Sequence, residues 1–401
     1  MSDESITPAM RSHGWNLHLL AKSRAKPFAG LYQHPDNPFL KFRDLVDELR
    51  LCFHDDENWQ DLAFGLDKGY HSHDFPLFVT EGDLDIVIPC LPQPDPQQRA
   101  VVKYHVVCHT GCQFAENSPL EDHIKASCAS HIRLPTRRRE PRYLAVDAAS
   151  SNNRITRIPR HTKSRRRKRS ESALSDEEFE GASEILVPVP DLLDPTKARE
   201  IVDSFREGVM LSARRCAITG EGRHWCFNQG VGPGVQTCHI VPPQHFHVYP
   251  TGVDTEDTKR HLVQAWCDTW SQDNGLLLRR DIRELFDERL ISIHPDTHRI
   301  RDFVPYDVIL HYHGLIARIP GIVDRDALAH HYEMTCIESI AAEMPTPESI
   351  TAEFNRYFGI GDSSASTASP DSSASMESYI TPENSRQFLA DVNSKLENLQ
   401  R

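Results

Sequence analysis

The chain has 401 residues, of which 39% are hydrophobic, and a formal net charge of -13 at pH 7. This length is sufficient for two or three domains with buried cores. No apolar run approaches the roughly 18 residues of a transmembrane helix, and no apolar segment follows a basic N-terminal start, so we expect an intracellular protein without a membrane span or signal peptide.

The N-terminal part alternates between strand-like and helix-like patterns. Residues 15–20 alternate as a strand does, and apolar residues at three- and four-residue steps predict a helix over residues 42–53. Further strands are predicted at residues 77–80, 84–88 and 100–107, the first two as a hairpin. We therefore expect a small α+β domain over residues 14–133.

Three cysteines and a histidine near the end of this domain have the spacing of a zinc site. They follow the pattern Cys-x3-Cys, fifteen residues, Cys-x2-His, at Cys108, Cys112, Cys128 and His131. Sets of thiolates and imidazoles bind structural zinc tetrahedrally. Alternatively these are core thiols, because Cys108 ends an apolar strand and free cysteine is often buried. The sequence leaves both interpretations open.

Residues 134–195 hold too little apolar surface to fold alone and are predicted to be a disordered linker. Residues 131–170 contain 14 Lys or Arg and two acidic residues, so the positive charge is concentrated here. The densest cluster consists of Lys163, Arg165, Arg166, Arg167, Lys168 and Arg169. Such a cluster predicts a nuclear-import signal bound by an import receptor, or a nucleic-acid contact, with a solvated tether as the alternative. We expect a nuclear protein, with a cytoplasmic one as the alternative.

Residues 196–345 are predicted to form a second folded domain. The expected elements are helices at residues 196–215, 258–270 and 324–343 and a hairpin at residues 290–303. Residues 346–401 are expected to be a disordered Ser-rich tail with a short amphipathic helix at residues 386–400.

Three pieces of the second domain resemble the HNH endonuclease family, in the branch found in many fungal proteins of unassigned role. They are Thr237-Cys238-His239-Ile240, Asn274-Gly275-Leu276 and Leu285-Phe286-Asp287. The resemblance extends over residues 197–343. It implies a ββα-metal (His-Me finger) domain, in which two strands and a helix enclose one divalent metal ion, within a chain of the α+β class.

The resemblance also implies roles for four residues. His239 would be the general base, and Asn274 would hold the loop and orient His239. Cys238 and Asp287 would bind the metal, with Mg, Mn, Ni and Zn not distinguished. Phosphodiester hydrolysis needs these parts, because a neutral imidazole can take a proton from water and a divalent ion can stabilise the leaving oxygen.

The sequence departs from the family at Arg283, one helical turn before Asp287, where the family has another metal ligand. A guanidinium has no lone pair for a metal, but it binds phosphate well. Asp281 could replace the ligand, although it lies roughly 200° around the helix from Arg283. Two main functions follow: a metal-dependent nuclease acting on DNA, with RNA as another substrate class, or a weakened or inactive HNH-fold module that binds nucleic acid or protein. A protein-binding scaffold is a third hypothesis.

Overall fold

A computed structural model describes most of the N-terminal 342 residues. The described ranges are residues 6–21, 26–54, 59–67, 75–91, 100–115, 117–138, 155–159, 184–188, 193–222, 234–249 and 258–342. Contacts group residues 1–350 into one unit. The predicted Ser-rich tail, its helix at residues 386–400 and the basic cluster at residues 163–169 lie outside the described residues.

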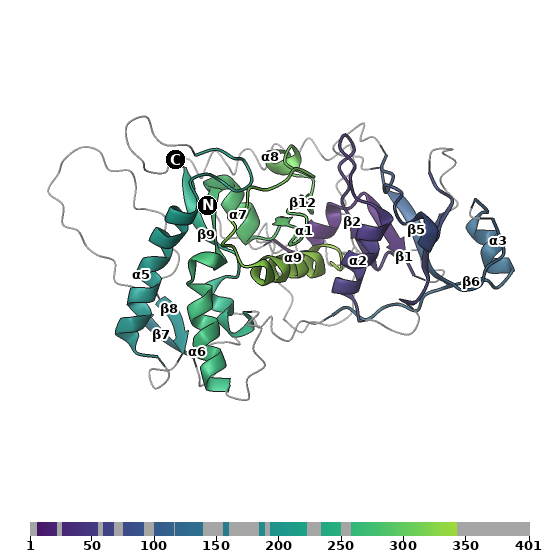
Figure 1. Ribbon diagram of the computed structural model, residues 1–401. Coiled ribbons are helices and arrows are strands. Elements are labelled where there is room, and N and C mark those ends of the chain that lie inside the picture. Colours follow the sequence, from purple (N-terminus) through teal and green to yellow (C-terminus); the bar gives the residue numbers. More distant parts are fainter. Residues whose placement is uncertain are drawn as a thin grey trace, which may run out of the picture. The chain divides into compact units, whose positions relative to one another are not determined.

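Six strands form a mixed sheet in the N-terminal part, in the order β2-β1-β5-β3-β4, with β6 also paired to β5. Figure 1 labels β1, β2, β5 and β6 of this sheet. Strands β1 and β5 run parallel, and the other neighbours run antiparallel. The strands are β1 (Leu17–Leu20), β2 (Ala29–Leu31), β3 (Leu62–Leu66), β4 (Phe78–Val79), β5 (Val102–His109) and β6 (Ala129–His131). The short helix α1 (Pro8–His13) precedes β1, and the short helix α3 (Leu120–Lys125) lies between β5 and β6 in the chain.

Helix α2 (Phe42–Cys52) covers this sheet, which confirms the helix predicted from apolar spacing. The Asp44 carboxylate accepts a hydrogen bond from the Lys41 backbone N–H at 2.8 Å, which helps to fix the first turn. The buried Phe42 ring packs against Phe64 of β3 and Tyr104 of β5, with centroids 5.2 and 5.3 Å away. The apolar stripe of α2 thus supplies one side of the N-terminal core.

The hairpin predicted at residues 77–88 is wrong. Strand β4 pairs with β3, and the three residues after Thr80 form a 3-10 turn, η2 (Glu81–Asp83). The backbone beyond this turn bonds to the start of α2, because Arg43 N donates to Leu84 O at 2.8 Å and Ile88 N donates to Leu40 O at 2.8 Å. Partners distant in sequence therefore replace the local pairing that the pattern indicated.

The predicted linker contains regular structure. Strands β7 (Ile155–Pro159) and β8 (Glu184–Pro188) pair antiparallel, with Arg157 opposite Leu186. The expectation of disorder throughout residues 134–195 is therefore wrong for these ten residues.

Two antiparallel strand pairs and several helices form the C-terminal part. The strands are β9 (Val235–His239), β10 (Gly275–Arg279), β11 (Ile291–Ile293) and β12 (Ile300–Asp302). The helices are α5 (Pro195–Ser212), α6 (Thr258–Thr269), α7 (Arg280–Asp287), α8 (Asp307–Leu310) and α9 (Arg325–Ser339), with 3-10 turns η3 (Pro243–Val248) and η4 (Gln272–Asn274). The predicted helices at residues 196–215, 258–270 and 324–343 and the hairpin at residues 290–303 are confirmed, as is the mixed α+β class.

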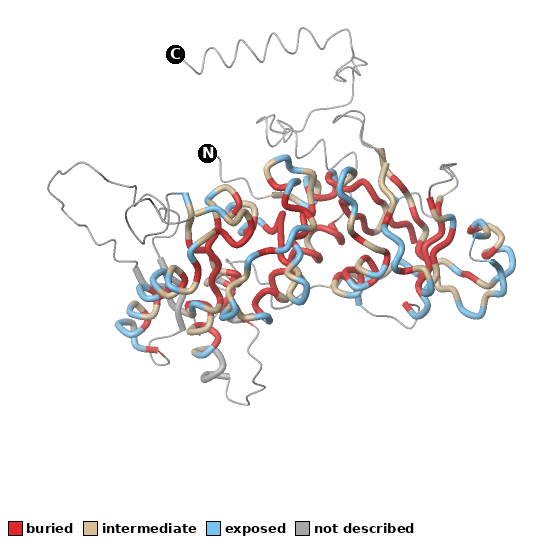
Figure 2. The backbone as a smooth tube through the Cα atoms, turned by 45° about the horizontal axis from the view of Figure 1, so that its top comes forward, coloured by how far each residue is buried: buried red, intermediate tan, exposed pale blue. Residues whose placement is uncertain are grey.

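Helix α9 belongs to two apolar cores at once. Ala327 and Leu328 pack in the core around β9, β10 and α7, whereas Tyr332 and Cys336 pack in the core of the N-terminal sheet. Buried residues accordingly occupy most of this helix (Figure 2). The sheet and the C-terminal elements therefore share one packing element.

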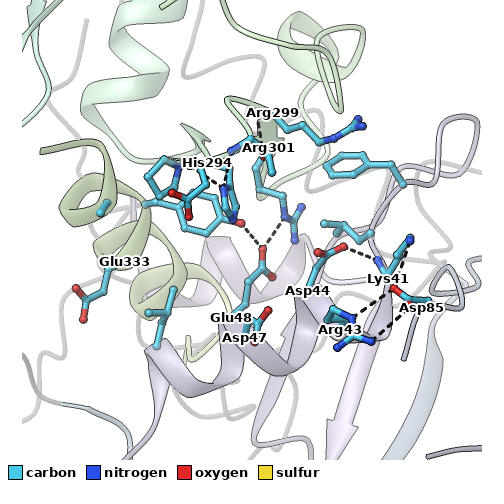
Figure 3. Close-up of a pocket in the computed structure, with 18 residues that line it drawn as sticks. Lys41, Arg43, Asp44, Asp47, Glu48, Asp85, His294, Arg299, Arg301 and Glu333 are labelled. Carbon is cyan, nitrogen blue, oxygen red and sulfur yellow. Dashed lines mark hydrogen bonds and ion pairs between the residues drawn. The ribbon is translucent and has the colours of Figure 1, made fainter. Parts of the chain in front are cut away.

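A buried ion pair lies beside this shared helix. Arg301 Nε lies 3.2 Å from Glu48 Oε1, and the Tyr332 hydroxyl donates to the same oxygen at 2.7 Å (Figure 3). The carboxylate thus compensates a guanidinium that is almost completely buried.

Within the described ranges, no helix is long and apolar enough to cross a membrane.

Candidate active site

Two strands and a helix bring together the residues that the HNH resemblance singled out. Strand β9 pairs antiparallel with β10, with His239 opposite Gly275 and Cys238 opposite Leu276. Helix α7 follows β10 directly and packs on both strands. Neighbouring residues of a strand point to opposite faces, so Cys238 faces the α7 core and His239 faces away from it.

Asn274 is fully buried and fixes the backbone that follows His239. Its side-chain oxygen accepts from Val241 N at 2.9 Å, and its amide nitrogen donates to Val241 O and Thr269 O, each at 2.9 Å. The Asn274 carbonyl accepts from Ile240 N at 2.9 Å. These bonds hold the loop, and they act on His239 through the backbone that follows it.

Helix α5 covers the face of the hairpin that bears His239. The Phe205 ring stacks on the imidazole with centroids 3.9 Å apart and planes 18° apart, and Trp270 meets it edge-on at 4.8 Å. Helix α5 lies close to β10 because Gly275 has no side chain: a Cβ there would lie 2.2 Å from Val209 Cγ2. The aromatic cover over His239 is thus held by close helix packing.

This cover determines the protonation state of His239. Burial, assisted by the positive charge of Arg283, lowers the pKa of His239 to about 3. The Nε2 atom is buried and has no hydrogen-bond partner within the described part of the chain. The imidazole is therefore neutral at physiological pH, as a general base must be, but it is less basic than an ordinary histidine.

Cys238, Arg283 and Asp287 form a connected cluster between β9 and α7. The Cys238 thiol donates to Asp287 Oδ1 at 3.3 Å, and Arg283 Nε donates to Asp287 Oδ2 at 3.2 Å. Arg283 Nη1 also donates to Gln236 Oε1 at 2.9 Å, which joins the helix to the strand. The structure therefore brings together the two predicted metal ligands and places the guanidinium on one of them.

Charge within this cluster is partly neutralised. Burial raises the pKa of Asp287, and the nearby Arg283 guanidinium opposes that rise. Burial and the charge of Asp287 raise the pKa of the Cys238 thiol well above its ordinary value. Cys238 is therefore protonated at neutral pH unless a cation displaces its proton.

The donors present would fit a divalent metal only in part. Cys238 Sγ and Asp287 Oδ1 are close enough to share an ion, and the thiolate would favour Zn²⁺ or another soft to borderline cation over Mg²⁺. Asp281 does not replace the missing ligand, since Arg279 holds both of its oxygens at 2.7 Å. A metal at this position would thus have two protein ligands and complete its shell with water or phosphate.

The four predicted zinc ligands do not come together. The Cys112 and Cys128 sulfurs lie 2.8 Å apart, but Cys108 donates to Gln60 O at 3.1 Å. The His131 ring bonds to His105 Nδ1 at 3.0 Å. The structure instead brings His109 and His123 to Cys112 and Cys128, so two of the four predicted residues, Cys108 and His131, lie outside the group that could hold an ion. Strand alternation could have identified His109, because it shares a face with the buried Val107.

A separate cavity lies beside α2 and the β11–β12 hairpin (Figure 3). Three of its cations meet carboxylates of the same cavity: Lys41 and Arg43 pair with Asp85, and Arg301 pairs with Glu48. None of its described lining residues belongs to the cluster around His239.

The segment that contains this cluster matches a known protein family. Residues 216–294 match the family model described as HNH endonuclease, and this segment holds β9, β10 and α7. Searches among curated proteins and among solved structures find no match. The match extends over fewer residues than the resemblance at residues 197–343, but it contains His239, Asn274 and the Cys238 cluster. Residues 216–294 therefore form an HNH endonuclease domain.

Proposed function

We propose that this protein is a metal-dependent nuclease that hydrolyses phosphodiester bonds in DNA, with His239 as the general base. The observation that carries the proposal is the family match over the β9–β10–α7 segment, in which His239 ends the first strand. HNH nucleases use a divalent metal. Here Cys238 and Asp287 are the residues that would hold it, and a bound ion would stabilise charge on the leaving oxygen.

The chain's own residues divide the remaining work. His239 removes the proton from the attacking water, and Asn274 keeps the backbone after His239 in place through its bonds to Val241 and Thr269. The stacked ring of Phe205 must move aside for water to reach the imidazole. We therefore expect activity to depend on how firmly α5 is seated on the hairpin.

A second candidate function is an HNH-fold module that binds nucleic acid or protein with little or no hydrolysis. The specific observation in its favour is Arg283, which stands at a ligand position and donates to Asp287. An internal cation at that place competes with a divalent ion for the same carboxylate. Nuclease activity therefore requires that the divalent ion, or the phosphate that it binds, separates Arg283 from Asp287.

The test is nicking of supercoiled plasmid by the full-length protein. The proposal predicts open-circular product with Mg²⁺, Mn²⁺, Ni²⁺ or Zn²⁺ and none with a chelator; a parallel reaction with structured RNA compares the two substrate classes. Salt-sensitive binding of DNA without nicking in any metal would favour the binding module. If the protein neither nicks nor binds DNA, the result would favour the third hypothesis, a protein-binding scaffold.

We further propose that the basic cluster at residues 163–169 directs nuclear import, as its density indicates. A reporter fused to residues 155–175 should accumulate in nuclei. Alanine at the five positions from Arg165 to Arg169 should return it to the cytoplasm. If the reporter and its alanine variant have the same distribution in the cell, the cluster does not direct import, and a tether or a DNA contact would be its role.

A further inference from the structure

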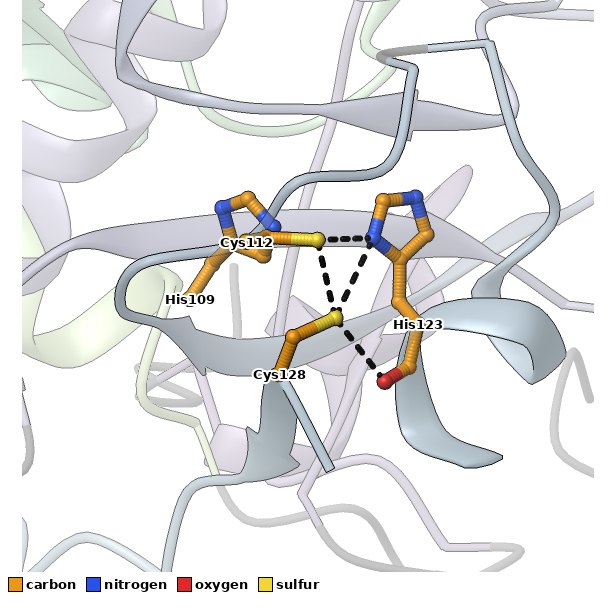
Figure 4. Close-up of side chains that lie close together, drawn as sticks. All are labelled: His109, Cys112, His123 and Cys128. Carbon is orange, nitrogen blue, oxygen red and sulfur yellow. Dashed lines mark hydrogen bonds between the residues drawn. The ribbon is translucent and has the colours of Figure 1, made fainter. Parts of the chain in front are cut away.

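Four metal-ligating side chains meet at one end of the N-terminal sheet, far along the chain from the HNH domain. One potential donor atom from each of His109, Cys112, His123 and Cys128 lies within 4.8 Å of all the others (Figure 4). The Cys112 sulfur lies 3.2 Å from His123 Nδ1, and the Cys128 sulfur lies 3.7 Å from the same nitrogen. Tetrahedral zinc with bonds of about 2.0 to 2.3 Å requires its ligand atoms to lie roughly 3.3 to 3.8 Å apart.

Four different pieces of backbone supply these donors. His109 ends β5, Cys112 follows in the next loop, His123 lies on α3, and Cys128 immediately precedes β6. The ligands form two local pairs, His109-x2-Cys112 and His123-x4-Cys128, with ten residues between the pairs. Short pairs of this kind, joined by a longer connection, are typical of structural zinc sites.

Aromatic packing holds the two histidines in place. The Phe78 ring stacks on His123 with centroids 3.9 Å apart and planes 12° apart, and it meets His109 edge-on at 5.1 Å. The Nε2 atoms of both histidines are buried and have no hydrogen-bond partner among the described residues. Burial lowers the pKa of both rings, so both are neutral and have a lone pair to donate.

The surroundings of the Cys112 sulfur also suit a bound thiolate. The Phe114 backbone N–H donates to Cys112 Sγ at 3.3 Å, a contact of the kind that orients and stabilises a metal-bound sulfur. The Cys112 and Cys128 sulfurs lie 2.8 Å apart, closer than two sulfurs on one tetrahedral zinc ion, so the two side chains would have to separate by somewhat less than about 1 Å when the ion binds. The two sulfurs and the imidazole of His123 therefore converge on a common point.

We propose that His109, Cys112, His123 and Cys128 bind one structural zinc ion. Two sulfurs and two imidazole nitrogens form a closed tetrahedral donor set that selects zinc and leaves no position for a substrate. The thiols lose their protons when the ion binds, so binding weakens as the pH falls.

The site explains how α3 and β6 are held on the sheet. Their own apolar support is small, a cluster of five buried residues: Ala63, Phe78, Val107, Leu120 and Ala129. Helix α3 has only six residues, too few to be stable on its own. A zinc ion bound at both ends of the segment between residues 109 and 128 would fix its fold, because metal-binding free energy becomes folding free energy.

Zinc content of the full-length protein, purified without chelator, tests the proposal. We expect zinc in the wild type and about one equivalent less in Cys112→Ser and Cys128→Ser. Matched controls are Cys108→Ser and His131→Gln, two metal-ligand residue types from the same region, which should keep their zinc. Cys238→Ser should also keep this equivalent, so the result does not depend on the metal proposed for the HNH domain.

Cobalt spectra separate loss of a ligand from loss of the fold. The wild type reconstituted with Co²⁺ should show tetrahedral ligand-field bands and thiolate charge transfer, and His123→Cys should retain the bands with stronger charge transfer. Wild-type protein without zinc would overturn the proposal, as would equal zinc loss in Cys108→Ser. A Cys112–Cys128 disulfide, found by thiol titration of the unreduced protein, would also overturn it.

Discussion

Arg283 and Asp287 lie one turn apart on α7 and form an ion pair with Nε and Oδ2 separated by 3.2 Å. The HNH resemblance places a metal ligand at each of these positions. A guanidinium cannot bind a metal, yet it holds positive charge next to the carboxylate and thereby replaces part of the electrostatic role of a cation. The consequence for activity can be measured at Arg283.

Arg283→His should increase metal-dependent nicking. An imidazole one turn before Asp287 would add a third donor to Cys238 and Asp287 and remove the competing charge. Changes in a metal's ligand environment alter affinity or activity on the order of tenfold or more. Nicking rates of the two proteins across a metal titration measure the effect.

Arg280→His is the matched control, since Arg280 is an exposed arginine on the same helix, paired with Glu284. It should leave the rate unchanged. A lower rate in Arg283→His than in the wild type would mean that the guanidinium contacts the phosphate in a working enzyme, and that the ligand-loss explanation is wrong.

Phe205→Leu should make His239 a stronger base. The substitution removes the stacked ring and admits water, so the pKa of His239 should rise from about 3 towards its ordinary value near 6.5. A general base works only when it is deprotonated. The variant should therefore nick faster at pH 8 and lose rate as the pH falls below about 6.5, whereas wild-type His239 stays neutral throughout that range.

Val202→Ala, another buried position of α5, controls for a general loosening of the helix. It should lower stability, as large-to-small core changes do, without adding a new acid limb to the pH profile. Identical acid limbs in the wild type and Phe205→Leu would show that the ring does not control the proton affinity of His239.

His331 should make the stability of the protein fall in mild acid. Its Nε2–H donates to the Phe286 carbonyl at 3.0 Å, so Nδ1 accepts from the Ser292 hydroxyl at 2.8 Å and the ring is neutral. Burial, with the charge of Arg289, lowers the pKa of His331 to about 3. The unfolded chain takes up the proton near pH 6.5, so this contribution to stability is complete above pH 6.5 and is lost as the pH falls towards 3.

This single group should reduce the free energy of unfolding by about 2 kcal/mol between pH 7.5 and pH 5. His331→Phe should be less stable at pH 7.5, because it loses both hydrogen bonds, but it should show a correspondingly smaller decrease on acidification. Urea unfolding at the two pH values gives the comparison, with the exposed His54→Phe as control. Equal decreases in the wild type and His331→Phe would contradict the assignment.

Local patterns predicted the elements whose partners are local or whose buried stripe is strong. The apolar spacing from Phe42 to Cys52 was enough to predict α2, and the order of His239, Asn274 and Asp287 was enough to indicate the HNH segment. The pairing of β4 with β3 could not be predicted from the hairpin pattern, because β3 lies farther back in the chain. Pairing in that case depends on tertiary contacts that the hairpin pattern does not contain.

The sites show the same limit. The cysteines at 112 and 128 were identified by residue type, but their partners depend on which face of β5 meets α3, and this excludes Cys108 in favour of His109. The aromatic cover on His239 comes from α5, a helix whose docking position the sequence did not specify. The sequence was therefore enough to identify candidate residues from their chemistry. It was not enough to identify their neighbours, because these depend on how helices α3 and α5 pack on the strands.

The most direct test of the nuclease account is the initial rate of metal-dependent nicking of supercoiled DNA by His239→Ala, measured in the wild-type and Arg283→His backgrounds. Thermal unfolding must first show that the variant is folded, and His54→Ala serves as the histidine control. The account predicts a loss of at least about a hundredfold in either background, the low end for removing a general base. Full metal-dependent nicking by His239→Ala would contradict it and would place the active site elsewhere in the chain.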